Sequence, residues 1–296
     1  MNDAVTATQR DRAPGTASAR DRPVELRAGA ARATVLPGWG GRLASLKIDG
    51  REVLGAGIVG GGAPESWFSG CFPMAPFAGR LTGDRVVWAE EAVALPRPAP
   101  QVEAAHGTVD AAAWTVREAT PERALLRTEL AAPWPFGGWA EQRITLRDDA
   151  IELVLRCGND EREMPVSLGY HPWFRREVGG VVAELRFAPE ARFAEIGPGL
   201  FAQPVAGADA GPGDGARDHS YLHAGDPVIA WGDLELTLRS SHDVWHVFDG
   251  QRPAFCVEPL TAAPDGLQPD RTWAVGPGVV AELRFELSWA VRPTEV

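Results

Sequence analysis

Two ionisable side chains in this sequence stand directly before a proline, and both are of types that exchange protons. His171 lies in LGYHPWF (residues 168–174), and Glu258 lies in CVEPLT (residues 256–261). A residue before proline is restricted to extended backbone. We therefore expect each side chain to lie where a strand ends and a loop begins, and strand ends from distant positions meet at one mouth of a β-sandwich.

This pair of residue types suits acid/base chemistry. The ordinary pKa of histidine, about 6.5, lets His171 give or take a proton near neutral pH. Glu258 follows the apolar run at 254–257, and burial beside such a run raises a carboxyl pKa toward the range of a general base. Each residue also has a structural interpretation, as a core histidine bonded to backbone and as a glutamate in an ion pair, and both interpretations stay open.

Three further polar residues are candidates for binding a ligand. Arg80 ends the Pro- and Gly-punctuated stretch 72–81, and its fork of donors suits hydroxyls or a carboxylate. His106 precedes Gly107, where the missing side chain lets a ligand approach the backbone. Asp218 suits vicinal hydroxyls. A surface arginine and an aspartate in a turn are the structural alternatives.

Aromatic side chains accompany these polar groups. The sequence has 11 Trp and 11 Phe, and aromatic rings beside a polar cluster are typical of carbohydrate sites, where they stack on the CH faces of sugars. Trp173 and Trp245 are the candidate platforms, with a place in the core as the alternative for each.

Metal and nucleotide motifs do not fit the sequence. The pairs His219/His223 and His242/His246 have the HxxxH spacing, but neither has the glutamate of HExxH. The second pair lies in a strand-like stretch, where four residues span about 13 Å, too far for one ion. The sequence has no GxSxG elbow, no GxGxxG that opens a helix and no GxxxxGK[ST], so we expect no metal and no nucleotide cofactor.

Composition limits the class of protein further. The 296 residues carry a formal charge of -11, which argues against nucleic acid and anionic membranes as partners. No apolar run approaches the roughly 20 residues of a membrane helix. Three widely spaced cysteines and a start without an apolar signal region favour free thiols and a cytoplasmic location.

The elements that must position these residues are strands. Period-two alternation recurs along the chain, and 33 Gly and 25 Pro disfavour long helices. The predicted strands are 32–36, 42–48, 114–117, 125–130, 141–147, 151–156, 181–187, 234–239, 254–257 and 279–289. We predict an all-β chain, with antiparallel strands forming a sandwich or barrel.

Turns and boundaries follow from the same pattern. Residues 147–150 predict a hairpin turn, and residues 197–215 predict a long surface loop. The segment VVAELRF occurs at 181–187 and again at 279–285, which we interpret as a coincidence between two half-buried strands. We expect a disordered tail at 1–23 and a single domain at 24–296.

Taken in order, these stretches resemble the aldose 1-epimerase (galactose mutarotase-like) family. GYHPWF and CVEPLTAAPDGL carry the resemblance most specifically, joined by the Arg80 loop, His106-Gly107 and Asp218-His219. One departure is Gly79, because many members have Asn before the Arg.

The resemblance implies one large antiparallel β-sandwich with an open cleft and cofactor-free interconversion of the α and β anomers of an aldose. By the same resemblance, Glu258 is the general base and His171 the general acid, while Arg80, His106 and Asp218 position the sugar. The expected partner is a small sugar, with Trp173 among the binding residues, and the chain is expected to be a monomer or homodimer.

Three alternatives stay open at this stage. A hexose-6-phosphate epimerase of the same fold needs cationic groups, which Arg175 and Arg176 could supply. A sugar-binding sensor needs the cleft without turnover, and the presence of both His171 and Glu258 argues against it. A glycoside hydrolase needs two facing carboxylates. Asp218 and Glu258 could supply them, but this hypothesis does not explain the sequence around His171.

Overall fold

The computed structural model describes residues 22–55, 69–89, 91–95, 104–197, 200–206, 217–223, 225–250, 253–267 and 273–292. In these ranges the chain is built of strands, and the helical structure consists of one 3₁₀ turn at Thr82–Asp84. The predicted all-β class is confirmed. Of the tail predicted at 1–23, all but the last two residues lie outside the described residues.

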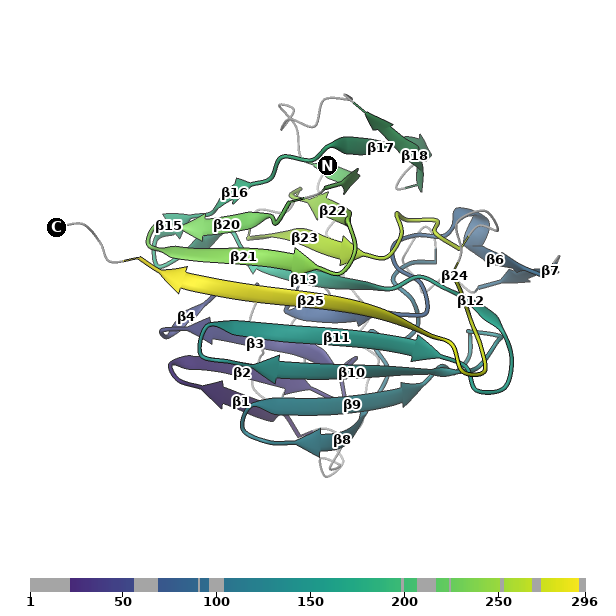
Figure 1. The fold of residues 1–296 in the computed structure, drawn as a ribbon, viewed down its shortest axis with the longest axis horizontal. Coiled ribbons are helices and arrows are strands. Elements are labelled where there is room, and N and C mark those ends of the chain that lie inside the picture. Colours follow the sequence, from purple (N-terminus) through teal and green to yellow (C-terminus); the bar gives the residue numbers. More distant parts are fainter. Residues whose placement is uncertain are drawn as a thin grey trace, which may run out of the picture.

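Two large antiparallel sheets form the sandwich (Figure 1). The larger has eleven strands in the order β1-β2-β3-β5-β13-β23-β22-β19-β17-β18, with β4 paired to β3. Its strands are β1 (Val24–Ala28), β2 (Ala31–Leu36), β3 (Arg42–Ile48), β4 (Arg51–Glu52), β5 (Cys71–Met74), β13 (Gly169–Arg175), β17 (Ala191–Gly197), β18 (Leu200–Ala206), β19 (Asp218–Leu222), β22 (Val244–Phe248) and β23 (Ala254–Leu260).

The second sheet has eight strands in the order β16-β20-β21-β25-β11-β10-β9-β8. They are β8 (Thr115–Ala119), β9 (Arg123–Glu129), β10 (Trp139–Leu146), β11 (Ala150–Gly158), β16 (Glu184–Arg186), β20 (Val228–Trp231), β21 (Leu234–Ser240) and β25 (Val280–Val291). Three two-stranded sheets flank the sandwich, made of β6 (Arg85–Trp88) with β7 (Glu91–Ala94), β12 (Met164–Val166) with β24 (Trp273–Val275), and β14 (Glu177–Val178) with β15 (Val181–Val182).

The main core lies between the two large sheets. Along β11 and β25, Leu153 pairs with Phe285 and Leu155 with Leu283, and all four side chains are fully buried. Because successive residues of a strand point to opposite faces, their polar neighbours are left at the surface. This alternation is the period-two pattern of the sequence, and the predicted hairpin at 147–150 joins β10 to β11 as expected.

Two stretches differ from the sequence prediction. The first copy of VVAELRF is broken into β15 and β16 and is largely exposed, whereas the second lies in the long central strand β25. The shared heptapeptide is therefore a coincidence, as predicted. The predicted loop at 197–215 is wrong in part, because β18 pairs there with β17. The stretch was predicted to be a loop because it is rich in Gly and Pro.

The large sheet also has a second, smaller apolar cluster on the face turned away from the main core. Its central members are Phe72, Met74, Trp173, Cys256 and Leu260. Their immediate neighbours in sequence, such as Tyr170, Phe174 and Val257, belong to the main core instead. One sheet therefore presents two apolar faces, and the second is available as the floor of a site.

All three cysteines are buried and free, as the sequence predicts. No helix among the described residues is long and apolar enough to cross a membrane.

A loop crossing beside β5 depends on glycine. Gly107 has φ +80° and bridges to Ala75 just beyond β5, and Ala75 accepts a hydrogen bond from the amide of Thr108. A Cβ added at Gly107 would lie 2.1 Å from the Ala75 carbonyl oxygen. The backbones can approach this closely only because residue 107 has no side chain.

We predict that Gly107→Ala lowers the free energy of unfolding by about 2 kcal/mol, because the backbone must move to relieve the overlap. Gly179→Ala is the matched control, since Gly179 also has positive φ (+60°) but has open space around its Cβ position. Urea denaturation measures both variants. Equal losses in the two would show that the close approach to Ala75 has no special importance.

Candidate functional site

Strands β13 and β23 bring His171 and Glu258 together. The two strands pair antiparallel at Gly169 with Leu260 and at Trp173 with Cys256. Continuing this register places His171 opposite Glu258. The ladder is interrupted between these two ends, where each strand has a proline that lacks the N–H needed for pairing.

The expectation that both residues lie at strand ends is therefore wrong. His171 is within β13 and Glu258 is within β23. The prolines do impose extended backbone, but they interrupt the hydrogen-bonding of the shared ladder instead of ending either strand.

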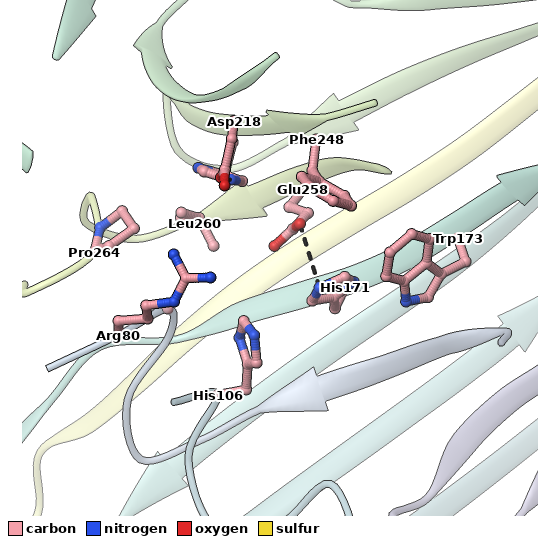
Figure 2. A pocket seen from close by; sticks show the side chains of 11 residues that line it. Arg80, His106, His171, Trp173, Asp218, Phe248, Glu258, Leu260 and Pro264 are labelled. Carbon is pink, nitrogen blue, oxygen red and sulfur yellow. Dashed lines mark hydrogen bonds and ion pairs between the residues drawn. The ribbon is translucent and has the colours of Figure 1, made fainter. Parts of the chain in front are cut away.

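The two side chains form a buried pair. His171 Nε2 lies 3.4 Å from Glu258 Oε1, and the side chains are 9% and 5% exposed (Figure 2). Both face an open cavity of about 160 Å³. The residues that line it are Gly79, Arg80, His106, His171, Trp173, Asp218, His246, Phe248, Glu258, Leu260 and Pro264.

Six of the residues singled out from the sequence, all except Trp245, thus lie around one cavity. Figure 2 shows that they come from loops and strands far apart in the chain. Strands β13, β23 and β19 of the large sheet supply His171, Trp173, Glu258 and Asp218, and the loops after β5 and before β8 supply Arg80 and His106.

Aromatic rings hold His171 in place. Phe72, which pairs with His171 across β5 and β13, stacks on the imidazole at 4.7 Å between ring centroids. Trp173 stacks on it at 5.0 Å, and Phe248 meets Trp173 edge-on. Trp173 is 3% exposed, so most of its surface is used to pack against protein.

The burial of the pair disfavours charge on both members. Burial raises the pKa of Glu258 well above its ordinary value, Asp218 adds to the rise, and Arg80 opposes it. Burial also lowers the pKa of His171 well below its ordinary value, and the field of His106 acts in the same direction. The two shifts together favour a state with one proton on the pair, held by the carboxyl.

Arg42 on β3 and His246 on β22 also act on the imidazole. The Arg42 guanidinium lies over the Phe72 ring at 4.7 Å, and it lowers the pKa of His171 together with His246 on β22. Only the backbone carbonyl of His171 itself opposes them.

His106 is held in an unusual backbone conformation. Its φ is +62°, uncommon for a residue with a side chain and often found at functional sites. The ring meets His171 edge-on at 5.0 Å, and its Nδ1 lies 3.1 Å from Met74 Sδ. Burial, reinforced by Arg80, lowers the pKa of His106 to about 3. His106 is therefore a neutral hydrogen-bonding group.

The Arg80 loop is fixed by the segment that follows β23. The amide of Asp265 donates to the Arg80 carbonyl, and the Asp265 carboxylate accepts from the amide of Thr82. Gly79 has φ +68°, and a Cβ there would lie 2.7 Å from Pro264 Cγ. Close packing against Pro264 therefore leaves little room for a side chain at position 79.

Asp218 is held by a histidine that the sequence analysis did not select for the site. His246 Nε2 lies 3.1 Å from Asp218 Oδ1, and its Nδ1 lies 3.0 Å from Ser220 Oγ. Ser220 and His246 are directly paired across β19 and β22. The hydrogen bond from His246 lowers the pKa of Asp218, which keeps its carboxylate ionised at the cavity.

Alternation along β22 separates its site residues from its core residues. His246 and Phe248 line the cavity, whereas Trp245 is 2% exposed in the main core and meets Phe285 edge-on. The suggestion that Trp245 is a stacking platform is therefore wrong. The HxxxH spacing had drawn attention to His246 only as a metal ligand.

One group of residues in the described part of the chain has donor atoms close enough to suggest a metal ion. One ligand atom each from His171, Cys256 and Glu258 lies within 4.8 Å of the others. However, Cys256 Sγ lies 3.6 Å from Nδ1 of the imidazole, while Glu258 contacts Nε2. A thiol and a carboxyl on different ring nitrogens form a hydrogen-bonded chain.

We predict that Glu258→Gln becomes more stable relative to the natural protein as pH rises. Because the folded carboxyl has a raised pKa, the folded state keeps its proton after the unfolded chain has lost it. Above the unfolded pKa, the natural protein therefore loses about 1.4 kcal/mol per pH unit that the variant does not lose. Urea denaturation from pH 5 to 8 measures this difference. Parallel curves would contradict the raised pKa of Glu258.

Comparison with known proteins agrees with this geometry. The aldose 1-epimerase family model matches residues 22–187, more than half of the chain. No curated protein sequence is a significant match. A putative aldose 1-epimerase from Escherichia coli K12 superposes with a TM-score of 0.75 at 18% identity, covering 91% of this chain and 99% of its own.

Two further solved structures share the fold. A galactose mutarotase-like protein from Clostridium acetobutylicum has a TM-score of 0.76 at 14% identity, over 90% of this chain and 94% of its own. Galactose 1-epimerase from Lactobacillus acidophilus has a TM-score of 0.73 at 13% identity, over 90% and 93%. With a sandwich of this type and the family match over more than half of its length, the chain belongs to the aldose 1-epimerase family.

Proposed function

We propose that this protein is an aldose 1-epimerase that interconverts the α and β anomers of a free aldose by acid/base ring opening and closure. The observation that carries the proposal is the buried pair of His171 and Glu258, 3.4 Å apart at the cavity. A base and an acid on one side of a small cavity match the two proton transfers of mutarotation. Membership of the epimerase family supports the same reaction class.

A single proton on the pair is enough for both transfers, because His171 donates a proton while Glu258 accepts one. In the reactive state the shared proton is on His171 Nε2 and Glu258 is ionised. Glu258 removes the proton from the C1 hydroxyl as His171 protonates the ring oxygen, and the C1–O5 bond breaks. This step leaves a neutral imidazole and a protonated carboxyl, the state that burial favours for the free pair. Ring opening therefore relaxes the pair electrostatically.

Ring closure reverses these transfers. Rotation about C1–C2 presents the other face of the carbonyl to the O5 hydroxyl. His171 then accepts the O5 proton as Glu258 returns a proton to O1, and the other anomer forms. No proton is exchanged with solvent over the cycle, which suits a pair that is 9% and 5% exposed.

The remaining polar groups are suited to hold the sugar. Asp218 is an ionised acceptor for hydroxyl protons, and His246 keeps it oriented. Arg80 supplies a cationic donor at the exposed side of the cavity, and neutral His106 can donate or accept. We assign Trp173 a place beside the sugar, with its ring held against His171.

The charge around the cavity favours a neutral sugar over a phosphorylated one. Arg175 donates to the Leu54 carbonyl and Arg176 to the Asp249 carbonyl, and neither lines the cavity. Both arginines considered for binding a phosphate therefore bind backbone carbonyls away from the cavity. A hydrolytic carboxylate pair is also disfavoured, because Glu258 faces His171.

We predict that the purified protein accelerates the optical-rotation change of freshly dissolved α-glucose or α-galactose, measured by polarimetry. Glu258→Gln and His171→Asn should each lower the catalysed rate roughly 10²- to 10⁴-fold, because each removes one proton-transfer group. The surface variants Glu282→Gln and His242→Asn are the matched controls and should keep the natural rate. No acceleration by the natural protein over a panel of aldoses would refute the proposed function.

The pH dependence should be a broad plateau. Activity requires one proton on the pair. A second proton binds only at a pH well below the ordinary value of histidine, because the pKa of His171 is lowered, and the last proton leaves only well above the ordinary value of glutamate. Polarimetry against buffer blanks should show the rate falling on the acid side only at a pH well below 6.5. An acid-side midpoint near the ordinary histidine value of about 6.5 would contradict the lowered pKa of His171.

A further inference from the structure

In the proposed reaction only one ring nitrogen of His171 exchanges a proton, so the imidazole must be held in one tautomer. Nε2 faces Glu258 and the cavity, so Nε2 must release a proton and take it back. A neutral imidazole has a single ring proton, and the hydrogen-bond partner of the other nitrogen determines where it stays. The partner of Nδ1 is therefore part of the catalytic arrangement.

Cys256 occupies that position. Its Sγ lies 3.6 Å from His171 Nδ1, and the side chain is fully buried. Cys256 and Glu258 are two residues apart on β23, so both project from the same face of the strand. One strand thereby places a thiol at one nitrogen of the imidazole and a carboxyl at the other.

The rest of the ring is surrounded by groups of other kinds. Phe72 and Trp173 stack on the imidazole, and His106 meets it edge-on. These aromatic contacts restrict the tilt of the ring. Neither of the two stacked rings can accept an in-plane N–H bond, whereas the sulfur of Cys256 can.

The thiol at this position stays uncharged. Burial raises the pKa of Cys256 well above its ordinary value, and the nearby acidic groups of Glu258 and Asp218 act in the same direction. A neutral sulfur is a weak acceptor. It can hold an N–H proton without stabilising the imidazolium as strongly as a carboxylate would.

We propose that Cys256 is a positioning residue that accepts a hydrogen bond from Nδ1–H of His171, so that Nε2 is the nitrogen that exchanges the proton during ring opening. This role rests on the proposed function. In the free protein, Nε2 then has its lone pair toward the protonated carboxyl of Glu258.

The first test is ¹⁵N NMR of the imidazole at neutral pH, with the His171 signals assigned by their loss in His171→Asn. The natural protein should show a protonated Nδ1 and an unprotonated Nε2. A proton on Nε2 in the neutral ring would overturn the proposal. This measurement does not depend on turnover, so it separates failure of the Cys256 role from failure of the proposed function.

The second test compares variants by polarimetry. Cys256→Ala removes the acceptor, so kcat should fall roughly tenfold or more with little change in KM, and the NMR signals should show both tautomers. Cys256→Ser restores an acceptor and should recover most of kcat together with the Nδ1–H tautomer. Cys157→Ala is the control, because Cys157 is also a fully buried free thiol but lies on β11 in the other large sheet.

Two outcomes would overturn the role of Cys256. One is a natural kcat in Cys256→Ala with an unchanged tautomer. The other is a loss in Cys256→Ser as large as the loss in Cys256→Ala, which would indicate that packing of the sulfur matters and hydrogen bonding does not.

Discussion

The site depends on a short break in the pairing of two adjacent strands. Strands β13 and β23 are in register on both sides of the break, and each has a proline within it. The register therefore places His171 opposite Glu258. Backbone pairing is interrupted at this point, and the two side chains contact each other across the strands. Because this contact is buried, the two groups hold one proton between them. The remaining features of the cavity support that pair.

Alternation along the strands explains how one sheet can serve both the core and the site. Tyr170, Phe174 and Val257 belong to the main core, and the alternate residues His171, Trp173 and Glu258 line the cavity. The apolar main core therefore lies directly behind the reactive groups. The loop of His106 bridges to Ala75 just beyond β5 through Gly107, and to Arg80 through Ala105, so the two loops restrict each other's movement.

Much of the site could be predicted from residue types and their neighbours. The prolines after His171 and Glu258 correctly indicated extended backbone, and six of the selected residues lie at one cavity. Their positions within strands could not be predicted, because the interruption of a ladder depends on the partner strand. His246 was missed for a related reason. Its importance comes from pairing with Ser220 and Asp218 across β19 and β22, which a single strand pattern does not contain.

The errors over Trp245 and over the loop predicted at 197–215 both show what a strand pattern leaves open. Trp245 and His246 are adjacent, and only the choice of face decides which one reaches the cavity. Strand β18 escaped prediction because glycines flank it, Pro204 lies within it and its residues do not alternate between apolar and polar. Strand patterns specify that two faces exist, whereas the packing of the whole sandwich decides which face becomes a core.

The most direct test of this account is the protonation state of Glu258 in the free protein. ¹³C NMR of the labelled glutamate carboxyls at neutral pH, with Glu258 assigned by its loss in Glu258→Gln, reports that state without substrate. The account predicts a protonated carboxyl, which takes up charge only well above its ordinary pKa. An ionised Glu258 at neutral pH would contradict the shared proton on which the proposed ring opening depends.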